Sequence, residues 1–166
     1  NTDAVTRLLN EGQISLGFVE GAFDRDAYEH RLLARDALLP VVAPTHPLAR
    51  LDRLGAEQLL AYPLYMREPG SGARSSIEQA YSAHGLEAKA HMAIGSTEAL
   101  KRLLTDGKGI AWLSQRVVER ELASGELQRL AVQDLQIERE LHVLWRLGTS
   151  LSPAPAAFLQ LSQVPG

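Results

Sequence analysis

Two loops rich in glycine and serine each join an apolar segment to a helical pattern, and they restrict the fold more than any other feature of the sequence. The first loop, residues 67–72 (REPGSG), follows the apolar run at 62–66, and the second, residues 95–98 (GSTE), follows residues 88–94. A small loop at such a position leaves backbone N–H groups unpaired at the positive end of the helix dipole. Two such helix starts that face one crevice would bind a small anion.

Strand and helix patterns alternate along the chain. The N-terminal part has a capped helical pattern, a strand pattern, and two apolar stretches that form two strands or one bent strand, at residues 3–9, 14–19, 31–34 and 37–43. Further along, predicted helices at 54–60, 73–83, 97–104, 117–122 and 156–161 alternate with predicted strands at 64–66, 89–94, 110–113, 127–132 and 139–147. This alternation predicts an α/β fold with largely parallel sheets, in which the strand at 110–113 is buried.

Composition narrows the classes of function. The 166 residues carry a formal net charge of -3, so the chain lacks the basic excess of a domain that grips nucleic acid. The absence of cysteine excludes disulfides, thiolate nucleophiles and Cys-ligated metals. No apolar run approaches the ~20 residues of a membrane helix and no signal-peptide pattern is found, so we predict a cytoplasmic location without a membrane partner. The chain begins at Asn1, which suggests a fragment of a longer protein.

No catalytic or metal-binding motif is recognisable. The five histidines include no pair at i, i+4 spacing, which disfavours a helical metal site. Ser71 lies between glycines, but the order Pro-Gly-Ser-Gly-Ala does not match the Gly-x-Ser-x-Gly of a nucleophile elbow. Nucleotide-binding glycine fingerprints are also absent. We therefore expect no enzyme activity, no catalytic residue, no metal and no cofactor.

The polar residues of the two loops have a structural explanation as well as a functional one. Ser96 and Thr97 stand where a helix cap is expected, and Gly70 and Gly72 permit a turn around Ser71 without any ligand. The functional explanation gains weight because both loops follow the carboxyl ends of strands, where open α/β sheets bind ligands.

Charged residues beside the loops bear on the same question. Arg67 is either the charge partner of a ligand or the surface partner of Glu68. A pocket for an anion requires that Glu68 and Glu98 turn away or be neutralised, and the nearby cations are Arg67, Arg74 and Lys101.

Seven stretches, in order along nearly the whole chain, resemble the effector-binding domain of LysR-type transcriptional regulators. They begin with Asn-Thr and LLNEG within residues 1–12 and continue with ISLGFVEG at 14–21, LPVVAPTHPLA at 39–49, REPGSGAR at 67–74, IGSTEAL at 94–100, GKGIAWLS at 107–114 and VERELASGEL at 118–127. Each stretch alone is a weak match to the family, but seven stretches in the same order are specific for it.

The resemblance implies two Rossmann-like α/β lobes joined by two crossover strands, similar to type 2 periplasmic binding proteins. The crossings would lie near residues 41–45 and 144–147. This assigns residues 1–43 and 147–166 to lobe I, which is incomplete at its N-terminus, and residues 44–146 to lobe II. The family's DNA-binding winged helix-turn-helix is absent from this chain, so DNA would be bound only through that missing domain. The family also associates through its effector-binding domain, which implies a homodimer or homotetramer.

In this family a small molecule, often an organic or inorganic anion, binds between the lobes and controls DNA binding through the geometry of the oligomer. The effector-binding residues implied for this sequence are Glu20, Gly21, Arg67, Ser71, Gly72, Ser96, Thr97 and a crossover residue, Thr45 or its neighbour Pro44. Many relatives carry a hydroxyl at the position of Glu20. Its carboxylate argues against a simple inorganic anion such as sulfate and favours an effector with an amino or hydroxyl group.

Three other functions stay open on sequence alone. A solute-binding protein of a transport system shares the lobed fold, although it would need a secretory signal. An enzyme acting on a small carboxylic acid has the same architecture and would turn its ligand over. A module that only dimerises would bind no effector at all.

Overall fold

The computed structural model describes residues 1–161, so the end of the predicted lobe I, at 166, lies outside the described residues. Within this range the helices are α1 (Thr2–Asn10), a 3-10 turn (Pro47–Arg50), α2 (Ala56–Leu59), α3 (Gly72–Ala83), α4 (Thr97–Leu104), α5 (Gln115–Ser124) and α6 (Pro153–Leu161). The strands are β1 (Gly17–Glu20), β2 (Tyr28–Val42), β3 (Tyr65–Arg67), β4 (Met92–Ile94), β5 (Ala111–Ser114), β6 (Gln128–Arg129) and β7 (Ile137–Arg146).

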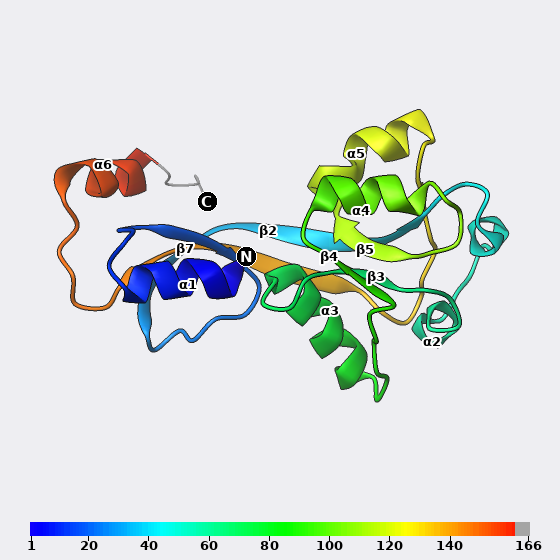
Figure 1. Ribbon diagram of the computed structural model, residues 1–166, viewed down its shortest axis with the longest axis horizontal. Coiled ribbons are helices and arrows are strands. Elements are labelled where there is room, and N and C mark those ends of the chain that lie inside the picture. Colours follow the sequence, from blue (N-terminus) through cyan, green and yellow to red (C-terminus); the bar gives the residue numbers. More distant parts are fainter. Residues whose placement is uncertain (162–166) are drawn as a thin grey trace.

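Two groups of elements are connected by the long strands β2 and β7 in an elongated molecule (Figure 1). We call the part with α1, β1 and α6 lobe I, and the part with α2 to α5 and β3 to β6 lobe II. The main sheet has the order β1-β7-β2-β5, with β6 also paired to β2, and β3 and β4 form a separate sheet. The predicted architecture of two α/β lobes joined by two crossover strands is therefore confirmed.

The strand register shows where the chain passes between the lobes. β1 pairs with residues 141–144 of β7, and β5 pairs with residues 38–41 of β2. Between these two pairings lies the opposed pair Asp36 and Arg139. The crossings predicted near 41–45 and 144–147 fall inside lobe II and lobe I instead, and we propose that the lobes divide close to Asp36 and Arg139.

The prediction of largely parallel sheets is wrong for the main sheet. β1, β2, β5, β6 and β7 pair only in antiparallel fashion there, whereas β3 and β4 are parallel. The reason is that β2 carries the chain into lobe II and β7 carries it back, so the two neighbouring strands run in opposite directions. The buried strand β5 pairs with β2 antiparallel, and a parallel bridge joins Leu64 and Ile110, the residues just before β3 and β5.

The two apolar stretches predicted between residues 31 and 43 form one strand, β2, with a register shift after Leu32. Asp36 interrupts the apolar pattern in the sequence, but it continues the strand and lies opposite Arg139. A charged residue thus occupies the middle of a long strand at the boundary between the lobes.

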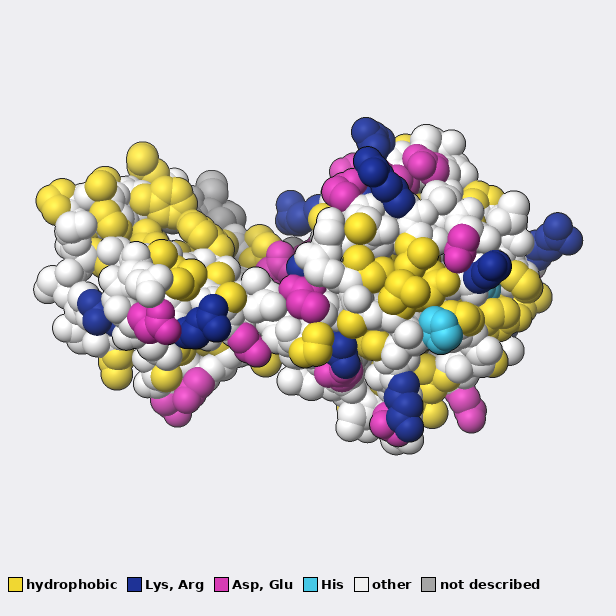
Figure 2. Space-filling view, in the orientation of Figure 1, with side chains coloured by type: hydrophobic (Ala, Val, Ile, Leu, Met, Phe, Trp, Pro, Cys, Tyr) yellow, Lys and Arg dark blue, Asp and Glu magenta, His cyan; other side chains and the backbone are white. Residues whose placement is uncertain are grey.

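Packing differs between the two lobes. Lobe II holds two extended apolar clusters, whereas the cluster of lobe I has four buried members, Leu9, Val19, Tyr28 and Leu144. Lobe I also exposes large apolar side chains, namely Phe18, Leu32, Leu147, Phe158 and Leu161. In Figure 2 such side chains gather at the left end, over α6, while acidic and basic side chains intermingle on the rest of the visible face.

Two buried histidines are expected to make stability depend on pH. Burial lowers the pKa of His46 and of His142, and one ring nitrogen of each has no hydrogen-bond partner among residues 1–161. The folded protein binds a proton at each ring more weakly than the unfolded chain does, and the unfolded chain takes up these protons as the pH falls below the ordinary pKa of 6.5. The contribution of the two histidines to the free energy of unfolding is therefore complete above about pH 6.5 and is lost at lower pH.

The size of this loss has an upper bound. Each histidine contributes at most about 1.4 kcal/mol per pH unit to the free energy of unfolding, between its ordinary and its lowered pKa. Urea unfolding at pH 7.5 and 5.5 measures the slope. The double variant His46→Gln/His142→Gln should flatten it, and an unchanged slope in that variant would contradict the assignment.

Candidate functional site

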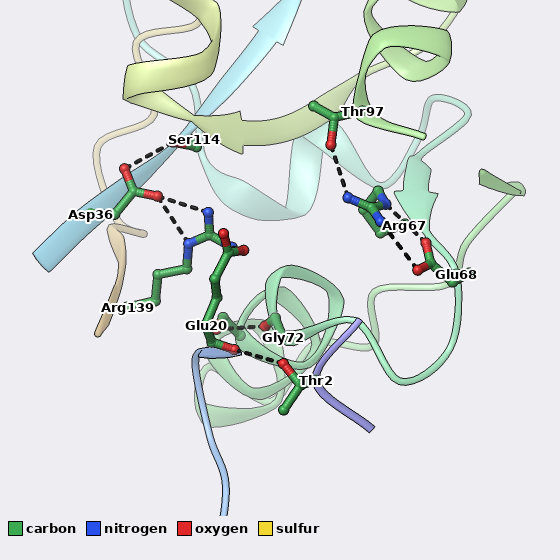
Figure 3. Close-up of polar contacts among 10 residues, drawn as sticks. Thr2, Glu20, Asp36, Arg67, Glu68, Gly72, Thr97, Ser114 and Arg139 are labelled. Atoms are coloured by element: carbon green, nitrogen blue, oxygen red, sulfur yellow. Dashed lines mark hydrogen bonds and ion pairs between the residues drawn. The ribbon is translucent and has the colours of Figure 1, made fainter. Parts of the chain in front are cut away.

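A cluster of charged side chains lies where β2 and β7 pass from one lobe to the other (Figure 3). Nε and Nη2 of Arg139 donate to Oδ2 of Asp36 at 3.0 and 2.8 Å. The other carboxylate oxygen of Asp36 accepts a hydrogen bond from the hydroxyl of Ser114, at the end of β5, at 3.0 Å. The side chains of Arg139 and Asp36 are 5% and 2% exposed, so they form a buried ion pair with its hydrogen bonds well satisfied.

Glu20, at the end of β1, brings a second carboxylate to Arg139. Its Oε2 accepts a hydrogen bond from Nη1 of Arg139, and its side chain is 50% exposed. The cluster therefore sets two carboxylates against one guanidinium, and one of the two carboxylates is open to solvent. The predicted site residue Glu20 lies at the lobe boundary as expected, but it faces a cation of its own chain.

The backbone of Glu20 touches the start of α3. A Cβ on Gly72 would lie 1.5 Å from the carbonyl oxygen of Glu20, and the same oxygen accepts a hydrogen bond from Thr2 Oγ1 at 3.3 Å. Gly21 has a φ of +80°, and a Cβ there would lie 2.9 Å from Gly72 O and from Ser76 Oγ. Glycine is needed at both positions for the end of β1 to approach α3 so closely.

Arg67, at the end of β3, connects the two loops noted in the sequence (Figure 3). Its guanidinium binds both carboxylate oxygens of Glu68, at 2.8 and 3.1 Å. It also donates to Thr97 Oγ1 at 2.9 Å and to Gly95 O at 3.3 Å. The hydrogen bonds from Arg67 lower the pKa of Glu68 to about 2. Of the two roles open for Arg67, pairing with Glu68 is the one this structure contains.

The other two cations near the loops, Lys101 and Arg74, pair with glutamates in different places. Lys101 pairs with Glu98 at 2.8 Å. This pair neutralises the Glu98 carboxylate, which was one of the predicted possibilities. Arg74 instead pairs with Glu78, one turn further along α3, at 2.7 Å. Both glutamates flanking the loops therefore have a cation beside them, Glu68 through Arg67 and Glu98 through Lys101.

The two loop serines have different surroundings. Ser96 is exposed, and its Oγ accepts a hydrogen bond from Ala99 N at 3.3 Å, so it performs the capping role considered for it. Ser71 is 5% exposed and makes no capping hydrogen bond to α3. Ser71 is therefore a buried hydroxyl at the start of a helix that does not use it as a cap.

Thr45 lies away from this cluster. Its Oγ1 would be 2.7 Å from a Cβ on Gly107, which follows the C-terminal end of α4, whereas Ser96 precedes the N-terminal end of the same helix. The length of α4 therefore separates Thr45 from Ser96 and Thr97. This agrees with the proposed division of the lobes near Asp36, because the C-terminal part of β2 pairs with β5 inside lobe II.

A groove of about 700 Å³ opens beside the cluster, between the loop that follows β1, the flank of α3 and β7. Gly21, Phe23, Gln79, Ile137 and Arg139 are among its lining residues. The loop belongs to lobe I and α3 to lobe II, so the groove reaches the lobe boundary from the side of α3. Gly21 is the predicted site residue that it contains.

Three residues of the cluster, Asp36, Ser114 and Arg139, were not predicted. Asp36 and Arg139 are 103 positions apart in sequence, and only the β2–β7 register brings them together. A usable signal was nevertheless present, because an aspartate between apolar stretches in a strand needs a partner when buried. The described residues contain no group of three or more acidic or histidine side chains that could hold a metal ion. No helix among them is long and apolar enough to cross a membrane.

Comparisons with known proteins agree on the kind of domain. A family model described as LysR substrate binding domain matches residues 1–163. A RuBisCO operon transcriptional regulator of Acidithiobacillus ferrooxidans is 35% identical over 127 residues, covering 76% of this chain and 41% of the relative. The uncharacterized HTH-type transcriptional regulator YeiE of Escherichia coli K12 is 33% identical over 147 residues, covering 89% of this chain and 49% of the relative. The chain thus spans half or less of the length of these relatives.

A solved structure is also similar. The regulatory domain of CcmR from Synechocystis PCC6803, in complex with 2-PG, superposes with a TM-score of 0.85 and 25% identity, covering 98% of this chain and 78% of that one.

Proposed function

Because this chain belongs to the family of LysR substrate-binding domains, we propose that it senses a small anionic effector between its two lobes on behalf of a bacterial LysR-type transcriptional regulator. The observation that carries this proposal is the buried polar cluster at the lobe boundary. Both crossing strands, the end of β1 and the end of β5 contribute to it through Arg139, Asp36, Glu20 and Ser114. A molecule bound there contacts both lobes and therefore acts on their relative position.

An anion is the favoured class of effector on chemical grounds. Two guanidiniums, Arg67 and Arg139, and the starts of α3 and α4 border the boundary between the lobes. The similar CcmR domain was solved in complex with 2-PG, which is therefore one of the molecules to test. We include Glu20, Gly21, Arg67, Ser71, Gly72, Ser96 and Thr97 in the proposed site and leave Thr45 out, because it contacts Gly107 instead.

The coupling to DNA would be a shift between two arrangements of the lobes. An effector that prefers one arrangement about 100-fold moves that equilibrium by about 2.7 kcal/mol. In the regulator this shift would act through a homodimer or homotetramer in the cytoplasm, and DNA would be held by a separate domain. We propose sensing without turnover, in keeping with relatives that are transcriptional regulators.

Thermal unfolding in the presence of small anions tests the proposal. A ligand at ~1,000 times its dissociation constant adds about 4 kcal/mol of stability, which raises the melting temperature by several degrees. The 166-residue chain would be screened with 2-PG, small mono- and dicarboxylates and inorganic oxyanions. Absence of any stabilisation across this panel would contradict anion sensing by this chain.

The double variant Ser96→Ala/Thr97→Ala is expected to weaken binding of the best anion by at least tenfold. Removing the cap of α4 costs about 1 kcal/mol of stability, and removing Thr97 Oγ1 deletes the hydrogen bond that ties Nη1 of Arg67 to the start of α4. Titration calorimetry measures the dissociation constant. Thr105→Ala, which deletes a hydroxyl bonded to Arg102 O at the other end of α4, is the matched control and should bind normally. Equal affinity of the double variant and this control would refute the role of these residues.

A further inference from the structure

We propose that Arg139 is the residue that binds the acid group of the effector, and that Glu20 occupies Arg139 as an internal anion which the effector must displace. This inference rests on the proposed function, since it assigns the contact made by an effector at the lobe boundary. It also names the class of effector able to make the exchange, an oxyanion with two negative charges, in place of the effector with an amino or hydroxyl group expected from Glu20 on sequence.

Arg139 is held in place without using all of its donors. A guanidinium has five N–H groups, and Nε and one N–H of Nη2 are directed at Asp36. Asp36 is 2% exposed and has both carboxylate oxygens bonded, to Arg139 and to Ser114, so it stays where it is. The remaining Nη1 points at Glu20, on the open side of the cluster.

Glu20 is the movable partner. Its carbonyl is fixed by Thr2 and by the approach of Gly72, so the backbone cannot follow the side chain. The carboxylate, by contrast, belongs to a side chain that is 50% exposed and has Arg139 as its ion-pair partner. Rotation about its side-chain bonds moves it into water, where a carboxylate is well solvated, and exposes both N–H groups of Nη1.

Charge explains why the exchange is selective. With Asp36 and Glu20 beside one guanidinium, the cluster has an excess negative charge that disfavours a further anion. A group tethered as closely as Glu20 competes at an effective concentration of the order of millimolar. A free monocarboxylate offers Arg139 nothing that Glu20 does not already supply, so it does not displace Glu20 at micromolar levels. A doubly charged oxyanion offers more charge and more acceptor oxygens to the guanidinium fork.

The test uses inorganic phosphate as the probe and compares three forms of the chain. Glu20→Gln keeps the shape of the side chain and removes the competing charge, and its dissociation constant for phosphate is expected to fall about tenfold. Glu138→Gln is the matched control, because it changes the net charge by the same amount on the residue next to Arg139. Glu138 is exposed and has no ion pair among the described residues, so this variant should shift the dissociation constant for phosphate less than twofold. Titration calorimetry at fixed ionic strength gives these values.

A second measurement locates the bound phosphate. The Nε–Hε resonance of Arg139 in an NMR spectrum, assigned through Arg139→Lys, should move as phosphate saturates Glu20→Gln. A gain below twofold in Glu20→Gln, an equal gain in Glu138→Gln, or an unmoved Arg139 resonance would each overturn the inference. The proposed function and this inference are contradicted by different results. An effector found in the anion screen stands even if Glu20→Gln gains nothing, and a gain in phosphate binding stands even if the screen finds no effector.

Discussion

Replacing Arg139 with leucine is expected to lower the free energy of unfolding by about 3–5 kcal/mol. The substitution leaves the carboxylate of Asp36, which is 2% exposed, without its cation inside the protein. Among residues 1–161, the Ser114 hydroxyl would be the one remaining donor to it, and one neutral hydrogen bond does not compensate a buried charge. Urea unfolding followed by circular dichroism measures the change. A loss below about 1 kcal/mol would show that the pair is not buried in solution.

Two further variants separate the burial of the charge from the loss of a long side chain. Arg35→Leu removes an arginine from the opposed strand, but that side chain is 73% exposed and 3.5 Å from Glu140, so its removal should cost less than about 1 kcal/mol. The double variant Asp36→Leu/Arg139→Leu removes both charges at once. Because apolar residues often replace a buried ion pair without loss, the double variant should be more stable than Arg139→Leu alone.

The outcome of these variants also bears on binding. If the double variant folds well yet no longer binds an anion, the ion pair is retained for recognition and not for stability. Such a result agrees with the general observation that a buried salt bridge is weak evidence for stability. Asp36 is 2% exposed, so we expect it to act on binding through the position of Arg139 and not by contact with the anion.

Local patterns in the sequence predicted much of the fold. The cap at Asn1, which accepts a hydrogen bond from Ala4 N at 3.0 Å, and the cap at Ser96 follow from side-chain chemistry within a few residues. The loops around Ser71 and Ser96 were likewise placed correctly at the starts of α3 and α4. What depends on neighbours in sequence was therefore accessible without a structure.

Features that depend on distant pairing were not accessible. The crossing near residues 41–45 was taken from the family resemblance, whereas the register of β2, which is one continuous strand over Tyr28–Val42, leads us to propose a division earlier, close to Asp36. The same register decides that Asp36 meets Arg139, and it separates Thr45 from the proposed site. The candidate site was thus predicted for its loop residues and missed for the ion pair between the crossing strands.

Replacing Gly72 with alanine is expected to destabilise the protein by about 3 kcal/mol, at the upper end of the range for overpacking. The added Cβ would lie 1.5 Å from the carbonyl oxygen of Glu20, which is backbone and is already bonded to Thr2. No rotation of a side chain relieves that overlap, so the start of α3 and the end of β1 must separate. Because Glu20 reaches Arg139 from this same position, the separation should also weaken anion binding.

Gly95→Ala is the matched control for this prediction. Gly95 opens the other loop, a Cβ there would meet nothing within 4 Å, and its backbone is not in the left-handed region. Urea unfolding should therefore show a change of less than about 0.5 kcal/mol for Gly95→Ala, as for surface substitutions in general. If Gly72→Ala unfolded at the same urea concentration as Gly95→Ala, the two lobes would not touch at Glu20 in solution. The site would then be more open than the distance between Gly72 and Glu20 requires, and an effector would have to close it by drawing β1 and α3 together.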